Sequence, residues 1–205
     1  MENKKWRCVV CGYVHTGPTP PDECPICKAG PEAFELIDTG ADDMDQELKK
    51  KIQRSLFKIS YGLYVVGSKS GDKINAQLCN TFFQITSDPL RVLVALNKNN
   101  LTNKYVNESG IYTVSVLGKQ GHDLVKRFGY QSGHKVDKFT EFNYKVGETG
   151  GPIVEKGCIA YYECKVLPDK VTDAGTHTMF LADVVAGDVI ADEEPMTYAY
   201  YRETR

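Results

Sequence analysis

The chain has 205 residues, of which 41% are hydrophobic and 25% are charged, and its formal net charge at pH 7 is −2. That length suffices for one substantial core and a small satellite domain. A nearly neutral charge argues against nucleic-acid binding, which needs a basic face for the phosphates. No apolar run approaches the ~20 residues of a membrane-spanning helix, so we expect a soluble protein.

Four cysteines near the N-terminus form two pairs, each with two residues between its members. Cys8 and Cys11 make the first pair, and Cys24 and Cys27 make the second. Two such pairs can place four thiolates at the corners of a tetrahedron, the geometry of a zinc or iron site. A disulfide framework fits less well, because secreted disulfide scaffolds are small and stapled throughout. The charged N-terminal residues do not resemble a signal peptide, so we expect a reducing, cytoplasmic location.

The spacing of these cysteines leaves zinc and iron both open, and the neighbouring residues bear on the choice. Trp6, Tyr13 and Phe34 predict a small aromatic core around the site. Gly12 directly follows Cys11 and allows a turn whose N–H groups point at a thiolate, which tunes the reduction potential of iron. Iron is therefore favoured, with zinc as the alternative.

Residues 6–13 and 20–27, together with Phe34, resemble the short rubredoxin domain of rubrerythrins, and the resemblance covers about residues 4–37. It implies an iron centre. Lys28 departs from the pattern, because the second metal-binding turn usually has glycine there, and we expect strain or a changed hydrogen bond in that turn. His15 is expected to be a surface residue, since four cysteines already complete a tetrahedron.

An acidic connector, residues 38–43, follows this metal-binding head. Asp43 and Gln46 resemble a capping box, which predicts the start of a helix. Apolar residues at helical spacing follow: Leu48, Ile52, Leu56 and Ile59. We therefore expect a four-cysteine metal domain at 1–38, a linker at 39–45 and a second domain at 46–205.

From residue 60 onward, β-branched and aromatic runs bounded by turn residues predict strands. The predicted strands are 63–66, 81–85, 91–96, 111–117, 158–167 and 176–185. Two short helices are expected between strands, at 102–109 before Gly110 and at 122–128 before Gly129. Many strands with few short helices favour a mainly β fold, a closed or nearly closed barrel, over a βαβ sheet.

The usual glycine-rich phosphate loops, GxGxxG and GxxxxGK[ST], are absent. Residues 97–102 offer another anion site, because amides and a lysine at a strand end precede a helix that opens at Thr102. A polar loop of this kind is more often only a loop, so the pattern alone leaves both interpretations open.

Several short motifs, in their order along the chain, resemble those of the flavin reductase family, and the resemblance covers about residues 45–203. These motifs are residues 62–67, 71–76, 80–86, 128–139 and 175–180. The resemblance implies an FMN-binding split β-barrel, commonly a homodimer. Flavoredoxins and the high-molecular-weight rubredoxins of anaerobes look most similar, and the latter join both domains.

Carried over to this chain, the resemblance implies three groups of FMN contacts. The ring would be lined by Gln77, Leu78, Cys79, Asn80 and Thr81; the phosphate would be held by Asn97, Lys98, Asn99 and Thr102; and Ser132, Gly133 and Lys138 would close over the cofactor. His177 would lie near the nicotinamide or substrate, although a solvent-facing strand histidine is equally consistent. Cys79, Cys158 and Cys164 are expected to be packing residues.

Both domains together imply an electron-transfer flavo-rubredoxin. FMN can accept hydride from NAD(P)H, the expected donor, and pass single electrons to an iron centre held by the four cysteines. An acceptor protein would follow, for which a flavodiiron oxygen or nitric oxide reductase is a candidate by analogy. The alternative is an NAD(P)H:flavin reductase whose cysteines hold a structural or docking zinc ribbon.

Overall fold

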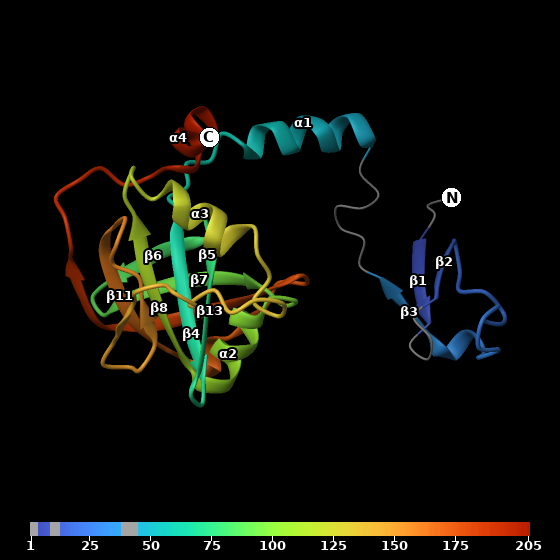
Figure 1. Ribbon diagram of the computed structural model, residues 1–205. Coiled ribbons are helices and arrows are strands. Elements are labelled where there is room, and N and C mark those ends of the chain that lie inside the picture. Colours follow the sequence, from blue (N-terminus) through green and yellow to red (C-terminus); the bar gives the residue numbers. More distant parts are fainter. Residues whose placement is uncertain (1–3, 9–12, 38–44) are drawn as a thin grey trace. The chain divides into compact units, whose positions relative to one another are not determined.

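The computed structural model describes residues 4–8, 13–37 and 45–205 (Figure 1). The chain divides into two compact units, Met1–Ile59 and Ser60–Arg205. Among the helices of the described residues, none is long and apolar enough to cross a membrane.

A three-stranded antiparallel sheet begins the first unit. Its strands are β1 (Lys4–Cys8), β2 (Val14–Gly17) and β3 (Phe34–Ile37), in the order β2-β1-β3. The short 3-10 helix η1 (Pro31–Ala33) leads into β3, with Pro31 at its start, where a missing N–H costs no helical hydrogen bond.

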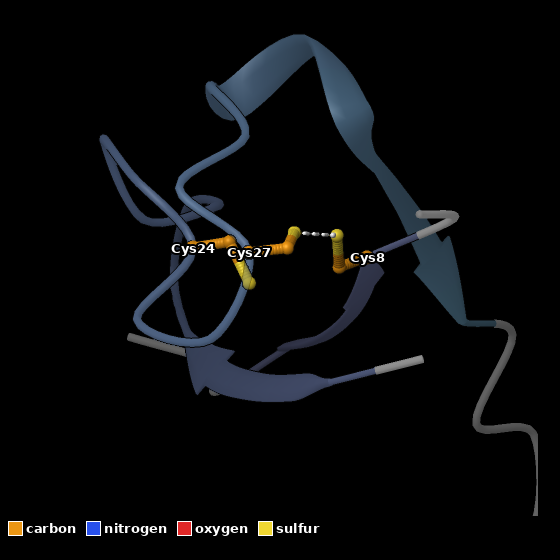
Figure 2. A group of neighbouring side chains, drawn as sticks. All are labelled: Cys8, Cys24 and Cys27. Carbon is orange, nitrogen blue, oxygen red and sulfur yellow. Dashed lines mark hydrogen bonds between the residues drawn. The ribbon is translucent and has the colours of Figure 1, made fainter. Parts of the chain in front are cut away.

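The predicted aromatic core of this unit is present. Phe34 is buried with Cys8 and Cys24, and Trp6 and Tyr13 pack against them. Figure 2 shows the cysteine side chains that this small core surrounds. The core is too small to stabilise a domain by burial alone, so a bound metal is expected to add stability here.

Helix α1 (Gln46–Leu56) follows within the first unit, and its N-cap is Asp45. The Asp45 carboxylate accepts a hydrogen bond from the N–H of Leu48 at 3.0 Å. The prediction of Asp43 as the cap was therefore wrong, and Asp43 itself lies outside the described residues. Asp45 takes the role because it directly precedes the first helical residue and so reaches the third N–H of the helix.

The second unit is built on an eight-stranded antiparallel sheet. Its strands are β4 (Tyr64–Ser70), β5 (Lys73–Cys79), β6 (Phe82–Ser87), β7 (Leu90–Asn97), β8 (Ile111–Leu117), β11 (Cys158–Val166), β12 (Thr172–Asp173) and β13 (His177–Val189). The order is β5-β4-β8-β11-β13-β7-β6, with β12 paired to β13. A separate short hairpin consists of β9 (Lys145–Val146) and β10 (Pro152–Ile153), and the 3-10 helix η2 (Pro168–Lys170) precedes β12.

The two ends of this strand order are neighbours in the sequence. Only Asn80 and Thr81 separate β5 from β6, so the sheet must curl to bring its edges together. The N–H of Ala95 on β7 donates to the carbonyl of Thr81 at 3.0 Å, which continues the pairing beyond the start of β6. This curled, mainly β architecture confirms the predicted split barrel.

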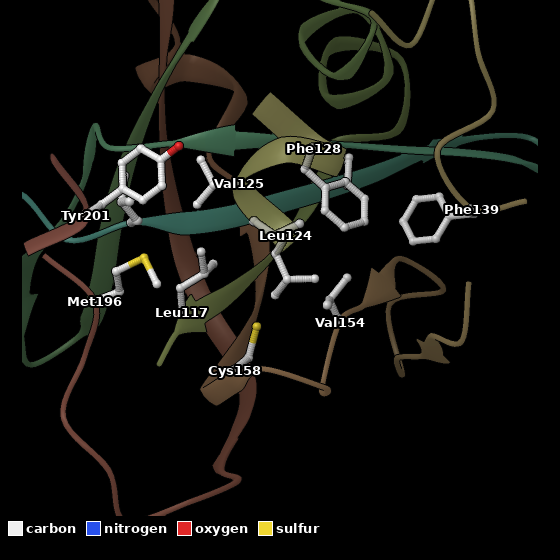
Figure 3. Close-up of a cluster of buried hydrophobic side chains, with 12 residues drawn as sticks. Leu117, Leu124, Val125, Phe128, Phe139, Val154, Cys158, Met196 and Tyr201 are labelled. Carbon is white, nitrogen blue, oxygen red and sulfur yellow. The ribbon is translucent and has the colours of Figure 1, made fainter. Parts of the chain in front are cut away.

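Two apolar clusters fill the second unit. One includes Phe82, Tyr112 and Phe180 inside the sheet. The other contains Leu124 and Phe128, which project from helix α3 (His122–Gly129). Figure 3 shows this second cluster, with the side chains of the helix facing those of strands and loops. The predicted packing roles of the cysteines agree with their burial, because Cys158 is 4% and Cys164 is 0% exposed.

The helix boundaries differ slightly from those predicted. Helix α2 (Leu101–Ser109) begins one residue early, after the N-cap Asn100, and ends as predicted at Gly110, which has a φ of 69°. Helix α3 includes Gly129 instead of ending before it. A Cβ at Gly129 would lie 3.2 Å from Leu78 Cδ2, so this glycine permits close helix–strand packing.

The C-terminal tyrosines form a helix, α4 (Tyr198–Thr204), which the sequence did not predict. Thr197 caps it, accepting a hydrogen bond from the N–H of Tyr200 at 3.1 Å. Tyr201 is buried in the α3 cluster, and its hydroxyl lies 2.7 Å from that of Tyr130. Aromatic residues favour strands locally, and here tertiary packing overrides that preference.

Candidate functional site

Three of the predicted metal ligands lie together. The Sγ atoms of Cys8, Cys24 and Cys27 are all within 4.8 Å of one another, and those of Cys8 and Cys27 are 3.6 Å apart (Figure 2). A tetrahedral site with metal–sulfur bonds of about 2.3 Å places its sulfurs roughly 3.8 Å apart, so this spacing fits a metal thiolate. The fourth predicted ligand, Cys11, lies outside the described residues.

Backbone hydrogen bonds hold the loops that carry these sulfurs. The N–H of Cys8 donates to the carbonyl of Tyr13, and that of Cys24 donates to Ala29, each at 2.8 Å. Lys28 has a φ of +63° and donates its N–H to the Cys24 carbonyl at 3.0 Å. The strained turn expected at Lys28 is therefore present, because a side chain in this region clashes with its own backbone.

His15 lies on β2 opposite Trp6. It is half-buried and does not belong to the cluster of potential metal ligands found among the described residues. The donor set is therefore built from thiols. Zinc and iron both accept such ligands.

A cavity of about 280 Å³ opens between β5, helix α2 and the segment that follows α3. Six of the predicted FMN contacts line it: Gln77, Leu78, Thr102, Ser132, Gly133 and Lys138. They come from three separate parts of the chain, which the curled sheet brings to one place. The resemblance to the flavin reductase family therefore named six residues that line one cavity.

Two residues of this cavity have unused hydrogen-bonding capacity. The Oε1 atom of Gln77 is buried and has no hydrogen-bond partner among the described residues. Lys138 is 4% exposed, and its Nζ donates to the carbonyls of Ala76 and Phe128, both at 3.0 Å. An ammonium has three N–H donors, so one N–H of Lys138 has no partner within the part of the chain that the structure describes. A ligand in this cavity would meet one unpaired acceptor and one unpaired donor, which is rare unless a ligand completes the bonding.

Burial changes the acidity of the Lys138 side chain. Removal from water disfavours the charged form, and this lowers its pKa to about 8. No carboxylate bonds to its Nζ within the described part of the chain. The cavity therefore contains a positive charge at neutral pH that a bound anion or carbonyl oxygen would stabilise.

The start of helix α2 forms another wall. The Asn75 Nδ2 donates to the Thr102 Oγ1 at 2.7 Å, and Thr102, which belongs to the lining, is 0% exposed. Asn100, the N-cap residue, also lines the cavity. A Cβ on Gly133 would overlap the Asn75 side chain, so a larger residue here would require that side chain to shift. A helix N-terminus beside a hydroxyl suits a phosphate group.

The remaining predicted ring contacts lie outside this lining. Cys79 is buried at the end of β5 with its Sγ 3.2 Å from the Thr81 Oγ1, and Thr81 donates to the Ala95 carbonyl at 2.7 Å. Burial raises the pKa of the Cys79 thiol, which suits a packing residue. Asn80 lies between Cys79 and Thr81 in the link from β5 to β6.

Three predicted phosphate contacts also lie outside the lining. Asn97 Oδ1 accepts from the N–H of Asn99 at 2.9 Å, and the Nζ of Lys98 forms an ion pair with Asp173 at 2.6 Å. The carbonyl of Asn99 lies 3.2 Å from the Nε2 of His134. These bonds shape the loop before α2, whereas Asn100 is the residue of that loop that reaches the cavity.

His177 begins β13 and pairs with Asn97 of β7. Its Nδ1 lies 2.9 Å from the Thr176 Oγ1, and its side chain is half-buried. It does not line the cavity described above. Sequence reasoning did not single out Asn75 or Asn100, although Asn75 lies two residues before Gln77 and so projects from the same face of β5.

Comparisons with known proteins agree with both parts of this description. Residues 56–205 match the family described as "Flavin reductase like domain", and residues 6–35 match "Rubrerythrin, rubredoxin-like domain". The chain is 40% identical over 153 residues to the high molecular weight rubredoxin of Moorella thermoacetica, across 74% of this chain and 66% of that protein. It is 43% identical over 148 residues to a ferric-chelate reductase (NAD(P)H) of Archaeoglobus fulgidus, across 72% of this chain and 86% of that protein.

A solved structure shows the same fold. The NADH:FAD oxidoreductase of Streptomyces globisporus superposes with a TM-score of 0.66 at 22% identity, covering 75% of this chain and 90% of that one. The matched family covers the whole barrel, and the thiol cluster lies in the rubredoxin-like match. The chain is therefore a member of the flavin reductase-like family that carries a rubredoxin-like domain at its N-terminal end.

Proposed function

We propose that this protein is an electron-transfer oxidoreductase that uses FMN in the barrel cavity and iron at the cysteine site. The proposal rests on two polar groups in one cavity, the buried and unpartnered Oε1 atom of the half-buried Gln77 and the incompletely bonded ammonium of the buried Lys138. The same chain carries clustered thiols. Relatives named as a rubredoxin and as an NAD(P)H-dependent reductase support it.

The cavity residues fit the groups of FMN. Gln77 Oε1 would accept from the ring N–H, and the third proton of Lys138 would bind a ring oxygen or nitrogen. The first turn of α2, Thr102 and Ser132 would hold the phosphate. Leu78 offers apolar surface to the ring. Residues 79–81 and 97–99 are the other predicted FMN contacts. We propose that they shape the walls of the FMN cavity.

FMN supplies the chemistry that joins the two sites, because it accepts two electrons as hydride and releases them singly. The protein's residues bind and orient it. Lys138 places a positive charge where reduction adds negative charge, which raises the reduction potential of the ring. His177 is proposed to lie at the nicotinamide or substrate position, on the strand end beside Asn97.

At the other site, Cys8, Cys11, Cys24 and Cys27 would hold the iron, which takes one electron at a time. NAD(P)H is the proposed donor. The proposed assembly is a homodimer, and the proposed final acceptor is another redox protein, of which a flavodiiron reductase is one candidate. Zinc at the cysteines would instead make the head a structural or docking module and the barrel a flavin reductase.

The test is an anaerobic titration of the purified, FMN-loaded protein with NADH and with NADPH, followed by visible absorption. We expect the ferric-thiolate and flavin bands both to bleach. A matched Cys27→Ser variant should lose the ferric band and keep the flavin response. Zinc in place of iron, or a ferric band that persists after the flavin is reduced, would contradict electron transfer between the sites.

A further inference from the structure

The segment that follows helix α3 forms one wall of the proposed FMN cavity and is otherwise open to solvent. Residues 130–133 all line the cavity, yet Tyr130, Gln131 and Ser132 are exposed. Ser132 is proposed above to help hold the flavin phosphate. A segment with so little buried surface needs specific bonds to keep one conformation, because ordering its backbone costs conformational entropy.

Two side chains anchor this segment, one on each side of Ser132. The hydroxyl of Tyr130 lies 2.7 Å from that of Tyr201. The Nε2 atom of His134 lies 3.2 Å from the carbonyl oxygen of Asn99. Ser132 is two residues from either anchor, a stretch of chain that spans at most about 7 Å. The position of the Ser132 hydroxyl therefore depends on both anchors.

Tyr201 is the fixed member of the tyrosine pair. It is 5% exposed, and its ring belongs to the apolar cluster that includes Leu124 and Val125 of α3 (Figure 3). Tyr130 is 66% exposed, so packing does little to hold its ring. The core thus sets the place of the Tyr201 hydroxyl, and the hydrogen bond between the two hydroxyls sets the place of Tyr130.

Helix α4, which carries Tyr201, is bonded at both of its ends. The N–H of Tyr198, its first residue, donates to the carbonyl of Tyr61 at 2.8 Å. Near its last turn, the Oγ1 atom of Thr204 lies 2.7 Å from the Nε2 atom of His122, the first residue of α3. The helix is therefore held in place without the bond between Tyr201 and Tyr130.

We propose that Tyr201 is a positioning residue for the FMN site, which holds Tyr130, and with it the backbone that carries Ser132, against the cavity. The inference rests on the proposed function, because it takes FMN as the ligand. It gives the C-terminal helix a part in cofactor binding, although Tyr201 lies 71 residues beyond Tyr130 in the sequence. The effect falls on the phosphate end of the flavin, because Ser132 lies between the two anchors.

The test compares the wild type with Tyr201→Phe, Tyr130→Phe and the double variant. Each substitution removes one hydroxyl and keeps the ring, so the packing is preserved and the variants should fold. Tyr198→Phe is the control, because the hydroxyl that it removes from the same helix bonds to no residue within the described ranges. Dissociation constants for FMN, and for riboflavin, which lacks the phosphate, are measured by flavin fluorescence on flavin-free protein, together with its thermal midpoint.

We expect both single variants to bind FMN about three- to tenfold more weakly, the worth of one hydrogen bond. The double variant should lose no more than either single variant, because both substitutions break the same bond. Riboflavin affinity should change by less than about twofold in every variant, since the loss concerns the phosphate. Tyr198→Phe should match the wild type.

Unchanged FMN affinity in Tyr201→Phe, whatever its thermal midpoint, would overturn the inference and make the bond a purely structural one. Additive losses in the double variant, an equal loss for riboflavin and FMN, or the same loss in Tyr198→Phe would overturn it as well. Failure of the wild type to bind FMN would instead defeat the proposed function.

Discussion

Lys138 is the residue whose position is hardest to explain by stability alone. Its nearly fully buried ammonium bonds, among the described residues, to two carbonyls and to no carboxylate, so it loses its hydration without gaining a counter-charge there. Its pKa falls to about 8, so it is mostly protonated at pH 7 and neutral above pH 8. A ligand acceptor at its third proton would offset this cost.

We therefore predict that Lys138→Met weakens FMN binding about tenfold at pH 7, the worth of one charge-assisted hydrogen bond. In the wild type, affinity should decline as pH rises through about 8, because the charged form is lost. The variant should show no such decline. Fluorescence titration between pH 6.5 and 9.5 measures both effects, with Lys165→Met as the control. A pH dependence retained by Lys138→Met would assign it to another group.

A second residue-scale prediction concerns Lys28. Its left-handed backbone conformation disfavours any residue with a Cβ, and its ion pair with Glu23 is exposed. Lys28→Gly should raise the thermal midpoint of metal loss from the head by several degrees. Glu23→Gln, which removes the ion pair and keeps the backbone conformation, should leave it nearly unchanged. A lower midpoint for Lys28→Gly would show that the side chain matters more than the strain.

The sequence predicted which kinds of side chain line the cavity better than it predicted how they are arranged. The motif around Ser132 and Lys138 named side chains that do line the cavity. Asn75 was not singled out, because the face of β5 that meets the cavity depends on the pairing of β5 with β4 and on the approach of Gly133. The two-residue spacing from Gln77 gives the shared face of β5, but the strand pairing and the approach of Gly133 are not visible in the sequence.

At the scale of elements, Glu163 of β11 connects the sheet to the turn before β10. Its buried carboxylate accepts from the N–H groups of Glu148 and Thr149 at 3.0 and 2.7 Å, and from the Thr149 hydroxyl at 2.6 Å. Burial raises the pKa of Glu163, but these hydrogen bonds outweigh it, so the net pKa lies below the usual value. The turn is thus held by a charged group.

Glu163→Gln should therefore lower the free energy of unfolding by about 1–3 kcal/mol at pH 7. A depressed pKa contributes stability above the ordinary carboxyl range and loses it as pH falls. The difference between variant and wild type should consequently shrink in acid. Urea unfolding at pH 7 and pH 4 measures it, and Glu148→Gln, which keeps the backbone donor, is the control. An equal difference at both pH values would rule out a charge effect.

Elements with strong local signals were predicted, and those that depend on tertiary packing were not. The strand at 111–117 and the end of α2 at Gly110 follow from propensity and a glycine cap. The capping of α1 by Asp45 was missed in favour of Asp43, since several aspartates precede that helix. Helix α4 was missed because its tyrosines are stabilised in a helix by burial against α3.

At the scale of the whole molecule, the two units have separate cores. Cys27→Ser should therefore abolish iron retention without reducing the ratio of flavin to protein. His15→Ala, a neighbouring change outside the thiol cluster, should retain the metal. Metal analysis together with the visible spectrum checks both. Loss of flavin in Cys27→Ser would show that the head supports the barrel.

Because the two units lie on one polypeptide, the rate of a reaction between them does not depend on protein concentration. A reaction between centres on one chain is unimolecular, so its rate is unaffected by dilution, whereas separate proteins react in proportion to the abundance of both. Synthesis of the chain also fixes the ratio of the two domains at one to one. Under the proposed function, each molecule would transfer electrons from flavin to iron at the same rate whether the protein is scarce or abundant.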